Sequence, residues 1–176
     1  MRRLFFLFLV GLALAPRPTR AQDQITRPVI ETMLSGFEDV PSLAEWRALG
    51  PAVVPLLIAI HDDTQVIQPV RLRAVEAMGA YSTPAARAFL LRVMNDPHEG
   101  TIVVREAAEA LAQSGGASAV APIARLLQSP DRTLREGAIV ALGRIDLATA
   151  RHELEQQLPR ETDADLRRQI GALLAR

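Results

Sequence analysis

Apolar residues recur along this chain at the spacing expected of α-helices. In 103–112, for example, Ala107, Ala110 and Leu111 lie three and four positions apart, with polar residues between them. This spacing places the apolar side chains on one face of a helix. The same arrangement occurs in 70–79, 134–143 and 166–175. The sequence therefore predicts four amphipathic helices, each with its apolar residues on one face.

These four helices are copies of one pattern. Their last residues fall at 79, 112, 143 and 175, so the pattern repeats every 31 to 33 residues. A second series of apolar helices precedes them, at 52–60, 86–94, 119–127 and 150–158. One helix pair cannot bury its apolar stripe alone, whereas stacked pairs bury it against each other. We therefore predict an all-α fold, an α-solenoid of about four helix pairs at 50–176.

Residues 22–49 follow the repeat less closely. Ser42 is followed three positions later by Glu45, which is the capping-box sequence at the start of a helix. We expect an N-terminal helical cap in which Leu43 and Trp46 cover the exposed end of the first helix pair. A ligand platform at Trp46 is the alternative.

The first 21 residues have the layout of a secretory signal peptide. Two arginines, Arg2 and Arg3, precede an apolar run of twelve residues at 4–15. That run is shorter than the roughly 20 residues that span a bilayer. We predict cleavage before Gln22 and a periplasmic or secreted protein. The alternative is an uncleaved N-terminal membrane anchor, with no membrane span in 22–176.

Charge and composition exclude several kinds of function. Removing 1–21 takes away four arginines and no acidic residue, which leaves 16 basic against 20 acidic residues. Nucleic-acid binding requires a concentrated basic face, so we expect no nucleic-acid partner. The chain has no cysteine, which excludes a cysteine nucleophile, a thiolate metal site and disulfides.

Several segments resemble HEAT repeats. "ALGPAVVPLLIAI" at 48–60, followed by "VRLRAVEAMG" at 70–79, is similar to the short bacterial form named after phycobilisome lyases, and "LREGAIVALGRI" at 134–145 is another copy. The resemblance covers about 43–176. It implies stacked helix pairs whose second helices line a concave face, and it implies use as a protein-binding scaffold.

Acidic and basic residues also recur between paired helices. Asp131 precedes Arg135 by four positions, and Asp163 precedes Arg167 by four. The resemblance implies that such residues form a ladder linking consecutive repeats, with Arg71 and Arg105 as further members. An aspartate at this place can also cap the helix that follows.

The first two repeats have longer connections within the pair. Arg71 follows Asp63 by eight positions, and Arg105 follows Asp96 by nine. A solenoid places equivalent loops side by side, and enlarged loops often bind partners. The loops at 61–69 and 95–103 contain His61, Asp62, Asp63, Asn95, Asp96, His98 and Glu99. A plain connection, a contact with a partner and a metal cluster remain open for these residues.

No combination of residues indicates catalysis, because the chain offers no Ser-His-Asp order, no phosphate-binding loop and no carboxylate pair in a defined cleft. We therefore predict a non-enzymatic, cofactor-free scaffold that binds a protein or peptide through its second-helix face and the adjoining loops. The candidate contact residues are Arg73, Glu76, Arg105, Glu109, Glu136 and Arg144 on the helices, and Asp63, His98 and Glu99 in the loops. The alternatives are a metal-binding or enzyme-accessory protein that uses the two loops, and self-association through the last helix.

Overall fold

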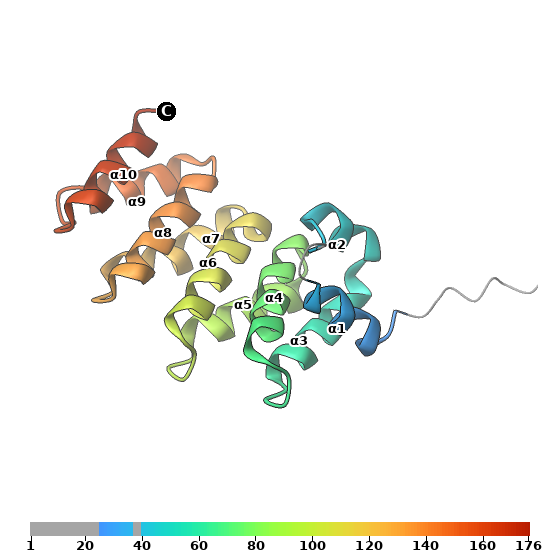
Figure 1. The fold of residues 1–176 in the computed structure, drawn as a ribbon. Helices are drawn as coiled ribbons and strands as arrows, with labels where there is room; N and C mark the ends of the chain where they lie inside the picture. The colour runs from blue at the N-terminus through green and yellow to red at the C-terminus, as the bar shows by residue number, and fades with distance from the viewer. Residues whose placement is uncertain (1–24, 37–39) are drawn as a thin grey trace, which may run out of the picture.

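The protein is described by a computed structural model that covers residues 25–36 and 40–176, and within these ranges it forms helices and no strand (Figure 1). The α-helices are α1 (Arg27–Ser35), α2 (Leu43–Leu49), α3 (Val54–Asp62), α4 (Gln68–Ala77), α5 (Pro84–Asn95), α6 (Thr101–Gly115), α7 (Ala117–Ala124), α8 (Arg132–Arg144), α9 (Ala148–Gln157) and α10 (Ala164–Leu174). Three 3-10 turns extend them: η1 (Pro51–Val53), η2 (Met78–Ala80) and η3 (Arg125–Gln128). The predicted signal peptide at 1–21 lies outside the described residues.

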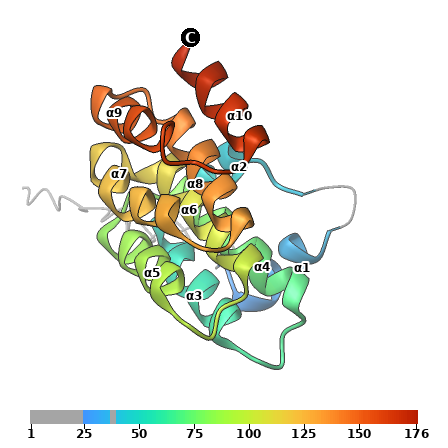
Figure 2. The same cartoon turned by 90° about the vertical axis from the view of Figure 1, so that its left-hand side faces the viewer.

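The helices after α2 form two layers. Helices α3, α5, α7 and α9 make one layer, and α4, α6, α8 and α10 make the other (Figures 1 and 2). Within the second layer α4 contacts α6, α6 contacts α8, and α8 contacts α10. The predicted all-α solenoid of four helix pairs is confirmed.

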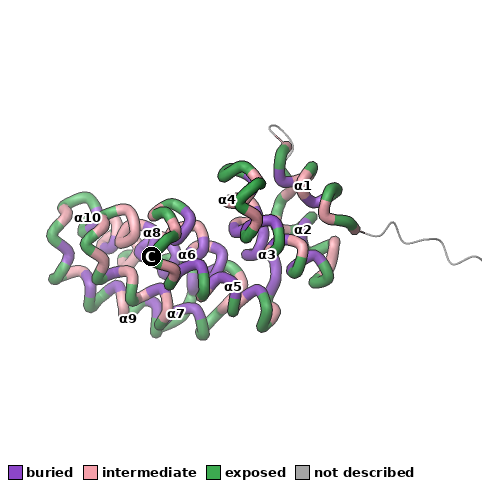
Figure 3. Tube along the Cα trace, turned by 90° about the horizontal axis from the view of Figure 1, so that it is seen from below, coloured by how far each residue is buried: buried purple, intermediate pink, exposed green. Residues whose placement is uncertain are grey.

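Aliphatic residues and alanines fill the space between the layers, because each helix carries its apolar residues on one side. Figure 3 shows buried segments along the inside of the stack and exposed segments on the outer turns. Ala108 and Ala141 are fully buried, as are Leu90, Leu111 and Ile139. Small residues at these contacts let neighbouring helices approach closely. The core is therefore continuous from one repeat to the next.

Two helices occupy the region predicted as the cap. α1 packs against α3 and α4, and α2 packs against η1 and η2. The capping box of Ser42 and Glu45 is present at the start of α2, as predicted. Trp46 is only 3% exposed, and its carbonyl accepts a hydrogen bond of 2.6 Å from the hydroxyl of Tyr81. Both cap helices therefore cover the outer side of the first pair.

In the described ranges no single helix has the length and hydropathy to cross a membrane. Only the short pair Leu43–Leu49 and Pro51–Asp62, bent by 90°, meets both conditions when its two helices are joined.

Aspartates link the later repeats. Asp131 caps α8 by accepting a 2.7 Å bond from the N–H of Thr133, and it also accepts from the hydroxyl of Thr101 at 2.9 Å. Asp163 caps α10 and accepts from Nε of Arg132 at 3.0 Å. In both cases the residue that begins one of the second-layer helices donates to the capping aspartate of the next helix in that layer. The predicted capping role is confirmed, and these aspartates also join neighbouring repeats.

The arginines of the predicted ladder behave differently. Arg71, Arg135 and Arg167 each donate to a backbone carbonyl of their own helix pair, at 2.6 to 3.1 Å. The acceptors are the carbonyls of His61, Ser129 and Glu161. For Arg71 and Arg167 the predicted links between repeats are wrong, because the carbonyl groups left free at the end of a helix lie nearer. Arg135 does link two repeats, since its Nε also donates to the carboxylate of Glu161 in the next helix pair at 3.1 Å.

Candidate functional site

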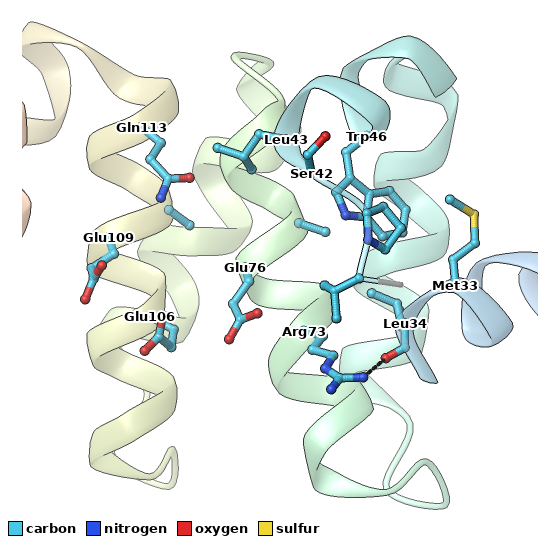
Figure 4. Close-up of a pocket in the computed structure, with 14 residues that line it drawn as sticks. Met33, Leu34, Ser42, Leu43, Trp46, Arg73, Glu76, Glu106, Glu109 and Gln113 are labelled. Carbon is cyan, nitrogen blue, oxygen red and sulfur yellow. Dashed lines mark hydrogen bonds between the residues drawn. The ribbon is translucent and has the colours of Figure 1, made fainter. Parts of the chain in front are cut away.

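A pocket of about 330 Å³ opens in the second-helix layer, at the place where the cap meets the repeats (Figure 4). Helices α1, α2, α4 and α6 supply its walls. Its apolar lining includes Met33, Leu34, Leu43, Trp46, Ala77 and Ala110. An apolar cavity of this size with a few polar groups is the usual form of a ligand-binding site.

The polar lining is predominantly acidic. Glu76 comes from α4, and Glu106 and Glu109 come from α6. Figure 4 shows Glu76 and Glu106 towards the gap between α4 and α6, below Gln113, and Glu109 on the side of α6 away from α4. Arg73 is the one basic residue among the described residues that line the pocket. Three carboxylates thus share the pocket with a single guanidinium.

That guanidinium is already occupied. Nη1 of Arg73 donates to the carbonyls of Leu34 and Gly36, both at 2.7 Å. These carbonyls lie at the end of α1, where helix carbonyls lack partners and the helix dipole favours a cation. Arg73 therefore attaches α4 to the cap and serves as part of the wall.

The three carboxylates differ in their partners. Arg105 pairs with Glu106 at 2.6 Å, and Arg144 pairs with Glu109 at 3.1 Å, both from outside the pocket lining. Glu76 accepts no hydrogen bond from any described residue. It is the carboxylate with the least compensation in the pocket.

Burial raises the pKa of Glu76, and the neighbouring charge of Glu106 raises it further. Burial also raises the pKa of Glu109, again with a contribution from Glu106 and in spite of the ion pair with Arg144. A raised carboxyl pKa means that the surroundings disfavour the ionised form. Burial therefore disfavours the ionised form of both carboxyls, and Glu76 has no ion pair with a described residue to offset it.

The structure brings together half of the residues predicted on the second-helix face. Arg73, Glu76 and Glu109 line the pocket. Arg105 and Arg144 pair with its carboxylates from outside. Glu136 lies away from it on α8, where it pairs with Arg132 at 2.7 Å.

The loop residues are arranged differently from the prediction. Helices extend into both loops, so the connections span only 63–67 and 96–100, within the predicted 61–69 and 95–103. Asp63 pairs with Arg27 of α1 at 2.5 Å, and Glu99 pairs with Nε2 of His61 at 3.0 Å. His98 is exposed on its loop. Asp63 and Glu99 therefore contact other parts of the fold.

His61 is a core residue. It is 1% exposed, and its ring stands edge-on to Phe89 with 5.1 Å between ring centroids. Within 25–36 and 40–176, no three His, Cys, Asp or Glu side chains lie close enough together to hold a metal ion. The two loops are therefore joined by one buried pair, His61 with Glu99.

Sequence reasoning missed several lining residues. Glu106 occupies the repeat position of Arg73, so the alignment of 70–79 with 103–112 could have identified it. Met33 and Leu34 belong to α1, which lies outside the repeat pattern. Nothing in a repeat alignment indicates which pair a cap helix will cover.

Residues 99–175 match the family model described as HEAT repeats. This part of the chain is therefore similar to HEAT repeats. Among solved structures, 19 chains match it. One is the structure of the complex of CpcE and CpcF of phycocyanin lyase from Nostoc sp. PCC7120, with 19% sequence identity, a TM-score of 0.53, and coverage of 93% of this chain and 67% of that chain. At this identity the match shows the shared fold. No curated protein sequence matches.

The pocket is lined by residues inside and outside the range that matches HEAT repeats. Its α6 wall lies inside 99–175, whereas α4 and the two cap helices precede that range. The pocket is thus formed where the cap covers the repeats.

Proposed function

We propose that this protein is a HEAT-repeat scaffold that binds a protein or peptide through its second-helix layer. The observation that carries the proposal is the pocket of about 330 Å³ on that layer, lined by Trp46, Leu43 and the carboxylates of α4 and α6. α-Solenoids use the extended surfaces formed by equivalent helices for binding. A cavity on such a surface can hold a side chain of the partner.

The surroundings of the pocket have the composition of a protein interface. Its centre is apolar, and partly exposed ion pairs surround it, such as Arg144 with Glu109 at 3.1 Å. Interfaces combine an apolar centre with a polar rim in this way. The two ion pairs also hold the rim side chains in place before a partner arrives.

In this proposal the protein does not catalyse a reaction. Glu106 and Glu109 are both engaged with arginines, which suits fixed recognition groups better than proton-transfer groups. The solved complex belongs to a phycocyanin lyase, but a shared fold at 19% identity does not carry an activity with it.

We also propose that the protein acts outside the cytoplasm, on the basis of the leader-like sequence at 1–21. Expression of the full chain followed by cell fractionation and intact-mass measurement tests this. The expected product begins at Gln22 and is found in the periplasm or medium. A full-length product in the membrane fraction would instead support an anchor, and a cytoplasmic product would contradict export.

Site-specific photo-crosslinking in the native envelope tests the binding proposal. A photoreactive residue at Gln113, beside the pocket, should crosslink to a defined protein, whereas one at the exposed Arg125 of the first-helix layer should not. Ala77→Leu fills the pocket and should abolish the crosslink. Ala121→Leu, on the exposed side of α7, is the matched control and should leave it unchanged. Equal crosslinking at both positions, or none at Gln113, would contradict the proposal.

A further inference from the structure

The pocket presents two different surfaces to an incoming group. The cap contributes an aliphatic and aromatic wall with Leu43 and Trp46, and Ala77 and Ala110 continue it on the repeats. The opposite edge carries the carboxylates of α4 and α6. A ligand that matches both must combine an apolar part with a positive charge.

The charges that line the pocket indicate which polar group of a ligand it can bind. Glu76 has no partner among the described residues, and the pocket arginine, Arg73, already donates to two carbonyls of the α1 end. An anionic group would add to three carboxylates, and a neutral donor would hydrogen-bond Glu76 without balancing its charge. A cationic donor does both, and its hydrogen bonds to a carboxylate are stronger.

We propose that the pocket binds a basic side chain of the partner, an arginine or a lysine, together with an apolar side chain next to it in the partner's sequence. This inference rests on the proposed function and specifies the partner's chemistry. The cation lies between Glu76 and Glu106, and the apolar side chain lies against Leu43 and Trp46.

Arginine fits the site better than lysine. Its planar guanidinium offers five donors, so it can bind carboxylates on two helices at once, here Glu76 on α4 and Glu106 on α6. Hydrogen bonds to charged groups are also stronger than neutral ones. The overall charge agrees, because 22–176 contain 16 basic and 20 acidic residues and so favour a basic partner.

The carboxylates also give binding a characteristic pH dependence. Burial raises the pKa of Glu76 and of Glu109, so part of each is protonated just above the ordinary carboxyl range. A cation binds the ionised form, and its arrival releases protons. Affinity for a basic peptide should therefore increase as the pH rises from the ordinary carboxyl pKa towards neutrality.

The single tryptophan of the chain, Trp46, makes the pocket directly observable by fluorescence, with titration calorimetry as a second measurement. The probes are capped peptides of the sequence Ala-Leu-Arg-Ala, the same peptide with citrulline in place of arginine, and the same peptide with glutamate. Citrulline keeps the shape of arginine and removes its charge. The arginine peptide should bind about tenfold or more tightly than the citrulline peptide, and the glutamate peptide should not bind.

Charge-removing variants locate the interaction. Glu76→Gln should weaken the arginine peptide about tenfold and leave the citrulline peptide unchanged. Glu155→Gln makes the same change at a half-exposed position of α9 and should alter neither. Calorimetry in two buffers of different ionisation enthalpy should show proton release for the parent and less of it for Glu76→Gln.

The outcomes separate this inference from the proposed function. Three results would overturn the inference that the pocket binds a basic side chain. They are equal binding of the arginine and citrulline peptides, no effect of Glu76→Gln on binding, and no peptide binding by either fluorescence or calorimetry. In each case crosslinking at Gln113 decides independently whether the surface binds a protein. Ethylguanidine, which is the end of an arginine side chain without a peptide, is a further probe. If it bound as tightly as the peptide and no crosslink formed at Gln113, both the basic side chain of a partner and the proposed protein-binding function would be overturned.

Discussion

The first two repeats and the last two use equivalent positions of their second helices in different ways. In each second helix, two positions that are three residues apart are equivalent in the repeat alignment and can be compared. They are occupied by Arg73 and Glu76 in α4, Glu106 and Glu109 in α6, Gly137 and Val140 in α8, and Gln169 and Ala172 in α10. Charged residues thus occupy both positions in the first half, whereas small, apolar or amide residues occupy them in the second.

This difference decides where the layer is open. A Cβ atom at Gly137 would lie 2.4 Å from Cγ of Arg105, so the stem of Arg105 rests directly on α8 and fills the groove between α6 and α8. Between α4 and α6 the corresponding space is the pocket. The α4–α6 groove is therefore open and the α6–α8 groove is filled, because the side chain of Arg105 lies over Gly137 in the second.

The two halves also start their helices differently. α8 and α10 begin with the aspartate caps Asp131 and Asp163, whereas α4 and α6 follow Ile67 and Gly100 without a side-chain cap. In the first half the imidazole of His61 instead contacts the carboxylate of Glu99, which joins α3 to the connection before α6. The aspartate caps thus belong to the C-terminal half, and the pocket beside Glu76 belongs to the N-terminal half.

The largest expected effect concerns a buried ion pair of the C-terminal half. Glu161 is 2% exposed and accepts from Nε of Arg135 at 3.1 Å. Arg135→Met leaves this carboxylate buried without its cation and should cost about 3–5 kcal/mol of unfolding free energy in chemical denaturation. Adding Glu161→Gln should recover part of the loss.

The N-terminal half offers the control. Arg92 pairs with Asp62 at 2.8 Å, and both side chains are nearly half exposed. Arg92→Met should cost no more than about 1 kcal/mol, because solvent screens such pairs. Similar losses for Arg135→Met and Arg92→Met would contradict the assignment of the stronger ion pair to the C-terminal half.

A matched pair of alanines tests the openness of the two grooves. Ala141 of α8 is fully buried, and Ala77, at the same repeat position in α4, is 2% exposed and lines the pocket. Ala141→Leu should overpack the core and cost about 1–3 kcal/mol, as should Ala108→Leu in α6. Ala77→Leu should cost less because its side chain extends into the pocket. Thermal melts check this, and an equal loss at Ala77 and Ala141 would show that the pocket is closed in solution.

The helix caps predict a smaller difference. Asp131→Ala removes the acceptor of the Thr133 N–H and of the Thr101 hydroxyl, and should cost about 1 kcal/mol. Gly100 has no side chain to lose, and Gly100→Ala should be close to neutral because a Cβ there meets open space. Urea denaturation of both variants measures the difference. A neutral Asp131→Ala would mean that the cap contributes nothing to the later repeats.

The smallest expected effect concerns how stability depends on pH. One carboxyl in each half should contribute to this dependence, with opposite sign. The pKa of Glu161 is lowered, since its bonds from Arg135, Gln157 and the Asp163 N–H outweigh its burial. Its contribution to stability is present above the ordinary carboxyl pKa and is lost as the pH falls below it. Burial instead raises the pKa of Glu76, so its contribution becomes unfavourable as the pH rises through and above the ordinary range.

Variants separate these two contributions. Glu76→Gln should raise stability slightly at neutral pH, with the gain disappearing in acid. Glu161→Gln should lower stability at neutral pH and reduce its loss on acidification. Denaturation at a series of pH values measures both. The same sign for the two variants would mean that the carboxyls of the two halves share one electrostatic environment.

Much of the fold was accessible from the amino-acid pattern. Helical spacing identified all eight repeat helices, because an apolar stripe is a local property of each segment. Short-range signals were equally reliable: Ser42 with Glu45 forms its capping box, and Asp131 and Asp163 cap their helices. These bonds span two or three residues, so no distant contact can displace them easily.

Long side chains were predicted less well. The arginines assigned to a ladder reach several acceptors, and three of them donate to nearby carbonyls. The acceptor that each arginine binds depends on which groups lie within a few ångströms in space.

The sequence by itself determined the helices, their pairing and the charges on the second-helix face, since these follow from periodicity and residue type. Only the tertiary structure decided that α1 and α2 lie over α4, that Trp46 and Glu76 share one pocket, and that Arg105 closes the next groove over Gly137. The physical reason is that a cavity is the space left between side chains from segments far apart in the chain. Its volume depends on all of their positions at once, which no repeat alignment contains.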